Sequence, residues 1–198
     1  MPNDVYTPPQ SDLLSETRVE ANQFYVVSKL KLAVLFLATL GFYLVYWFYI
    51  NWRNYRDTVG EKLMPAPRSI FYIFFTHSLF NKVDEILKIK HIEYDWSPKI
   101  LATLFVIVSI ASNALDRLSF REIGSPLTDI LSIAILPFFL IIILQAQEVI
   151  NLSQNDRVGS SNCKFTIYNY LWILLGFVFW MLIAVGLMDM LGIISIES

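Results

Sequence analysis

The chain has 198 residues, of which 56% are hydrophobic and only 16% are charged, with 15 basic and 17 acidic side chains. Soluble domains carry about 25% charged residues, so this composition excludes an ordinary soluble globule, a disordered chain and a disulfide scaffold. The near-neutral balance also excludes the strongly basic surface typical of nucleic-acid-binding proteins. The composition predicts an all-α integral membrane protein that has the lipid bilayer, and no nucleic acid, as its partner.

The first 28 residues are polar and acidic. They lack the basic start and the apolar core of a cleavable signal peptide. We therefore expect a polar N-terminal tail over residues 1–28, followed by a membrane domain over residues 29–198.

Four uncharged runs approach or exceed the length that a helix needs to cross a bilayer. A hydrocarbon core of about 30 Å corresponds to roughly 20 apolar residues in helical form. The second run is short, but the side chain of Lys99 at its start can extend to the interface. The pattern predicts four transmembrane helices, near residues 30–52, 98–116, 127–149 and 166–190.

A fifth uncharged run, residues 69–81, is too short to span. Helical spacing places most of its large apolar residues on one side, and the Pro65-Ala66-Pro67 sequence precedes it. We expect an amphipathic helix over about 67–90 that lies on the membrane surface. A re-entrant segment, or a helix packed across the mouth of the bundle, is the alternative.

Basic residues are unevenly distributed between the two sides that four spans would define. The loops after the first and third spans carry ten, whereas the N-terminal tail and the loop after the second span carry five. The positive-inside rule then places both termini outside the cytoplasm. Four basic residues follow the first span closely and are candidates for contact with lipid headgroups: Arg53, Arg56, Lys62 and Arg68.

Polar residues inside the predicted spans are the places where a functional site is expected. One hypothesis joins four of them into an intramembrane polar path: Asn113, Asp129, Gln145 and Glu148. The alternative is that Asn113 bonds a neighbouring helix and that Gln145 and Glu148 emerge among headgroups. The sequence contains no phosphate-binding glycine loop, nucleophile elbow or metal-ligand spacing, so we expect no catalytic residue, cofactor or metal.

Three strings, LGFYLVYWFYINWRNYR, PAPRSIFYIFFTHSLF and LPFFLIIILQAQEVINLSQN, lie within residues 30–155. With them the chain resembles a group of small bacterial multi-pass membrane proteins that have no assigned function. The resemblance implies a location in the bacterial inner membrane. It implies no chemistry, because no catalytic residue is defined for the group.

Two functions remain after these observations. The first is a non-catalytic accessory or assembly component, which works as a homo-oligomer or with a partner membrane protein. The second is a small oligomeric transporter or channel that uses the polar path. A lipid-directed enzyme is less favoured, because its candidate groups, His77, Asp84 and Glu148, are scattered along the chain.

Overall fold

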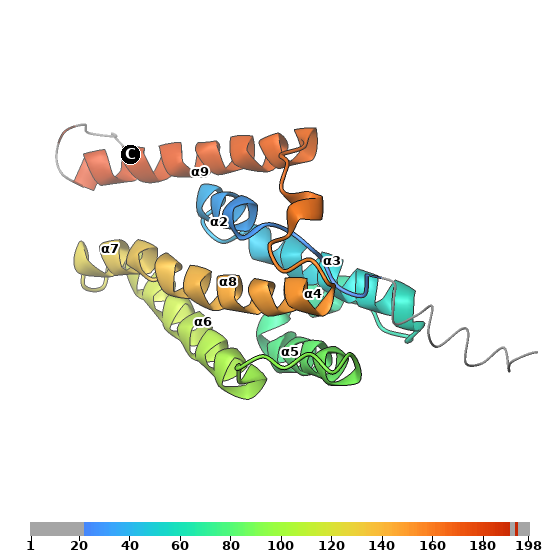
Figure 1. The fold of residues 1–198 in the computed structure, drawn as a ribbon. Helices are drawn as coiled ribbons and strands as arrows, with labels where there is room; N and C mark the ends of the chain where they lie inside the picture. The colour runs from blue at the N-terminus through green and yellow to red at the C-terminus, as the bar shows by residue number, and fades with distance from the viewer. Residues whose placement is uncertain (1–21, 191–192, 194–198) are drawn as a thin grey trace, which may run out of the picture.

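The computed structural model describes residues 22–190 and residue 193, and every regular element in this part of the chain is helical. The expected all-α class is therefore confirmed, while residues 1–21 of the expected tail lie outside the described residues. The elements, drawn in Figure 1, are α2 (Lys29–Ala38), α3 (Tyr43–Val59), α4 (Pro65–Ile70), α5 (Tyr72–Ile89), α6 (Pro98–Phe120), α7 (Leu127–Ala134), α8 (Leu136–Ser153), a 3-10 turn (Ser160–Asn162) and α9 (Ile167–Met190).

Three stretches of helix in the described part of the chain are long and apolar enough to cross a membrane. They are Pro98–Phe120, Leu127–Ser153 and Ile167–Asp189, and they correspond to the second, third and fourth expected spans. The middle stretch combines α7 and α8, which continue one another in Figure 1. The start of α6 is set locally, because the Ser97 side chain accepts a hydrogen bond from the backbone N–H of Ile100 and Pro98 occupies the first turn.

The first expected span, residues 30–52, is two helices and not one. α2 ends at Ala38 and α3 begins at Tyr43, and the chain turns sharply between them. Leu40 and Gly41 have φ values of 52° and 84°, a left-handed conformation that glycine adopts without strain. The Thr39 hydroxyl then accepts the backbone N–H of Tyr43 at 3.0 Å and caps the start of α3. Residues 29–59 therefore form a helical hairpin.

The segment that leads into α2 begins beside the end of α3. The Thr58 hydroxyl donates to the backbone carbonyl of Asn22 at 3.4 Å, so the chain leaves α3 where it approached α2. Further along, the backbone N–H of Tyr25 donates to the Asn51 side chain at 3.0 Å. The uncharged run is long enough to cross a bilayer, but its length alone carries no information about a reversal in the middle.

The tip of the hairpin reaches the middle of α9. Gly176 contacts the end of α2 so closely that a Cβ atom on it would lie 1.9 Å from the carbonyl oxygen of Ala38. The Trp180 indole donates to the carbonyl of Leu37 at 3.1 Å. α9 therefore packs mainly on α2 (Figure 1). Trp172 of α9 also contacts the rings of Tyr43 and Tyr46 on α3.

α5 runs antiparallel beside α6 instead of crossing the end of the bundle. Near one end of α5 the Trp96 indole donates to Asp84, and further along the His77 ring lies 3.1 Å from the Thr103 hydroxyl. The expected apolar side of the 67–90 helix is divided: Leu79, Val83 and Ile86 are buried, whereas Phe71 and Phe74 are exposed. Ser69, which precedes α5, is buried because α4 packs against α3.

The hydrophobic core lies in the half of the bundle that contains the loop between α8 and α9. Phe48 stacks on Tyr72 at 5.2 Å and contacts Phe105, which in turn contacts Phe139 at 5.4 Å. Ring pairs of this kind contribute roughly 0.5–1.5 kcal/mol each beyond burial of their area. In the opposite half no residue of 110–120 is buried, and only Thr128 is buried in α7. Along α9, only 6% of the most apolar stretch is buried.

Candidate functional site

A cluster of buried amides occupies the centre of the core. Gln147 and Asn151 are one turn apart on α8, so they face the same way, and neither has exposed surface. The Trp47 indole donates to the Gln147 side-chain oxygen at 2.6 Å, and Gln147 donates to Asn151 at 2.8 Å. Buried amides need such partners, because an unsatisfied one costs the free energy of its lost hydration.

These amides hold an extended backbone segment, residues 22–28, which we call the strap. Asn151 donates to the carbonyl of Val27 at 2.9 Å and accepts its N–H at 3.2 Å. Gln147 donates to the carbonyl of Tyr25 at 2.9 Å. Asn162 and Gln154 add bonds to the backbone of Val26 and Gln23. Side chains here satisfy backbone groups that a neighbouring strand satisfies in a sheet.

The loop between α8 and α9 also contacts the strap and the start of α2. The buried Lys31 ammonium donates to the Asn162 side chain and to the carbonyl of Lys164, both at 2.7 Å. Gly159 has φ of 70°, and a Cβ atom on it would lie 2.4 Å from the Val27 carbonyl. Asp156 accepts the N–H groups of Ser160 and Ser161, which hold the pKa of this carboxyl well below its usual range.

The four residues of the predicted polar path lie in two separate places. Glu148 forms ion pairs with Lys29 at 2.6 Å and with Arg157 at 3.4 Å. Gln145, about one turn earlier on α8, is exposed. Asp129 accepts from Ser119 and Ser125 at the turn between α6 and α7. Its position and that of Glu148 are separated by up to about 28 Å of helix.

Asn113, the remaining residue of the path, donates to the carbonyl of Ser109 on its own helix at 2.8 Å. No hydrogen bond among the described residues joins it to the other three. The amide pair Gln147 and Asn151 is not among the predicted site residues. It lies nearer the centre of the hydrophobic core than any of the four. Its sequence signal is two amides four residues apart, one turn from each other on the same side of α8.

The predicted headgroup contacts, Arg53, Arg56, Lys62 and Arg68, differ in their surroundings. Arg53 and Arg56 both pair with Asp57, at 3.7 and 2.7 Å. The Arg68 guanidinium stacks over Trp52 with 4.4 Å to the ring centroid. Lys62 is exposed in the turn before α4. Contact of this group with lipid headgroups stays a prediction.

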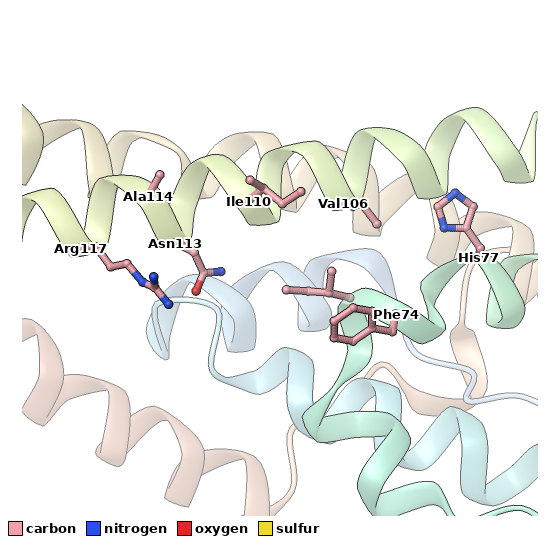
Figure 2. Close-up of a pocket in the computed structure, with 8 residues that line it drawn as sticks. Phe74, His77, Val106, Ile110, Asn113, Ala114 and Arg117 are labelled. Carbon is pink, nitrogen blue, oxygen red and sulfur yellow. The ribbon is translucent and has the colours of Figure 1, made fainter.

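An open groove lies between α5 and α6, with a volume of about 740 Å³ (Figure 2). Its walls are apolar over most of its length, with His77 at one end and Asn113 and Arg117 at the other. A smaller cavity of about 280 Å³ adjoins the tip of the α2–α3 hairpin, where Gly41 faces Ser112 and Asp116 of α6.

No family model, no curated protein and no solved structure matches this chain. Within residues 22–190 no three His, Cys, Asp or Glu side chains are close enough to share a metal ion.

Proposed function

We propose that this chain is a multi-pass protein of the bacterial inner membrane with three crossing helices and two re-entrant hairpins. α6, the α7–α8 stretch and α9 cross the bilayer, supported by their length and apolar composition. The α2–α3 hairpin enters from one face and returns to it, supported by the contact between Asn22 and Thr58. α4 and α5 form the second hairpin, whose apolar tip at Ile70, Phe71 and Phe74 is exposed.

This arrangement replaces four crossings with three and changes the expected orientation. The strap and the loop after α8 lie on the same face, because Gln23 bonds Gln154 and Lys31 bonds Asn162. Lys29 and Lys31 then join the more basic face. Among the described residues only Arg117 and Arg121 remain on the other. The positive-inside rule favours a cytoplasmic strap and an external end of α9, instead of both termini outside.

The role that these features favour is that of a non-catalytic component that binds another membrane protein, or a second copy, through α9. The observation that carries this role is the exposure of α9, which packs on α2 and, through Trp172, on Tyr43 and Tyr46 of α3. Only 6% of its most apolar stretch is buried. The central amides, by contrast, already have partners in the strap. These polar groups hold the fold together, whereas the exposed surface of α9 is available for binding.

Photo-crosslinking in intact membranes tests this role. A photoreactive amino acid is placed at Leu174 or Leu182, which are exposed on α9, and at the buried Phe105 as the control. We expect a protein adduct of one defined mass from at least one α9 position and none from Phe105. Lipid adducts alone at both α9 positions would contradict the role.

The second candidate is a small transporter or channel, favoured by the cavity at the hairpin tip. Breaks in membrane helices expose backbone groups that line binding sites in transporters. Here the break at Gly41 faces the polar groups of Ser112 and Asp116. Proteoliposomes loaded with pH- and potassium-sensitive dyes distinguish this candidate. Flux that is lost in Asn113→Leu but kept in Gln145→Leu would support transport through the tip, and absence of flux in the unaltered protein would count against it.

A further inference from the structure

We propose that the groove between α5 and α6 binds a phospholipid, with one acyl chain along the groove and the phosphate on Arg117. This site rests on the membrane placement proposed above but not on the role of α9. It differs in place from the basic residues near α3, since Arg117 lies close to the opposite end of the bundle.

The length and lining of the groove suit an acyl chain. Between Val106 and Arg117 the groove follows α6 for about 17 Å. Phe74 and Ile110 line its middle and are 78% and 61% exposed. Hydrocarbon covers such side chains at little cost, whereas a compact polar ligand would leave most of the groove empty.

Arg117 supplies the charge that recognises the headgroup. It lies one turn before the end of α6, where an interfacial phosphate is expected. None of the ion pairs among the described residues includes it. Guanidinium groups bind phosphate through two parallel hydrogen bonds. Figure 2 shows Arg117 and Asn113 extending side by side at this end of the groove, so the Asn113 amide is placed beside the same headgroup.

The far end of the groove has no Lys or Arg among its lining residues. His77 there is already bonded to the Thr103 hydroxyl. The groove therefore has a cationic end, at Arg117, and apolar walls along the rest of its length toward the membrane interior. A phospholipid that approaches from the leaflet on the Arg117 side has the same polarity.

Native mass spectrometry of the full chain released from detergent tests the site. The probe is palmitoyl-oleoyl phosphatidylglycerol, and the matched probe is the diacylglycerol with the same chains and no phosphate. Arg117→Gln removes the cation, Ile110→Trp fills the groove, and Arg121→Gln is the control because Arg121 lies outside the groove. Carbonate extraction of the same variants reports separately whether each is integrated in the membrane.

We expect Arg117→Gln to lower retention of the phosphatidylglycerol about tenfold, the effect of losing one charge-assisted pair, and to leave diacylglycerol retention unchanged. Ile110→Trp should lower retention of both lipids, and Arg121→Gln of neither. Equal losses in Arg117→Gln and Arg121→Gln would overturn the site in favour of unspecific attraction. So would disulfide-linked dimers of Ile110→Cys in a Cys163→Ser background, because a second copy would then fill the groove.

Discussion

Gln145 and Gln147 are two residues apart on α8 and have opposite environments. Gln145 is exposed beside a shallow cleft, whereas Gln147 bonds Trp47, Asn151 and the strap. The sequence places both glutamines near the end of one predicted helix. Which of the two is buried depends on the rotation of α8 relative to α3. That position follows from packing and not from the helix itself.

At this scale we predict that Gln147→Leu strongly destabilises the protein. The change leaves the Trp47 indole and the carbonyl of Tyr25 buried without partners, so it should lower the free energy of unfolding by about 3 kcal/mol. Gln145→Leu is the matched control and should change it by less than about 0.5 kcal/mol. Thermal unfolding in a mild detergent measures both, and equal shifts would contradict the central place of Gln147.

Glu148 has partners that its position in the sequence does not reveal. Glu148 was expected among headgroups or in a polar path, and it forms ion pairs with Lys29 and Arg157. Lys29 is 119 positions away along the chain. Its position next to Glu148 depends on the reversal of the α2–α3 hairpin, which composition and spacing do not encode.

At the scale of elements, one glycine determines how α9 attaches. α9 is apolar all round, so its sequence does not indicate which face packs. Gly176 identifies that face, because its backbone touches the carbonyl of Ala38. Gly186 lies ten residues later on the same helix with nothing within 4 Å of a Cβ placed on it.

We therefore predict different effects of alanine at these two glycines. Gly176→Ala forces α9 away from α2 and should cost about 2 kcal/mol, or about 6 °C in Tm. Gly186→Ala should leave Tm unchanged or raise it slightly, because alanine favours the helix. Calorimetry of the detergent-solubilised variants provides the measurement. A Tm loss in Gly186→Ala that matched Gly176→Ala would show that the contact with Ala38 is not the cause.

For the whole molecule, the decisive question is on which face of the membrane the strap lies. With a re-entrant α2–α3 hairpin, Asn22 and Thr58 share a face with Cys163, and Ile123 lies on the other. With four crossings, Asn22 would share the face of Ile123 instead. The location of Asn22 therefore distinguishes the two topologies.

We predict that Asn22→Cys in a Cys163→Ser background reacts with a membrane-impermeant maleimide in inside-out vesicles and not in intact spheroplasts. Thr58→Cys should behave in the same way and Ile123→Cys in the opposite way. Labelling of Asn22→Cys together with Ile123→Cys from the outside would restore the four-crossing topology.

The sequence by itself determined the helical class and three of the four expected spans as helices long and apolar enough to cross a membrane, because these depend on the length and polarity of local runs. It also contained the amides, but not their partners. Only the tertiary structure decided that residues 30–52 turn back, because the reversal is held by bonds such as that between Trp47 and Gln147, which are 100 positions apart. A run of apolar residues has the same transfer free energy whether it crosses the bilayer or enters and returns, and only its long-range contacts distinguish the two.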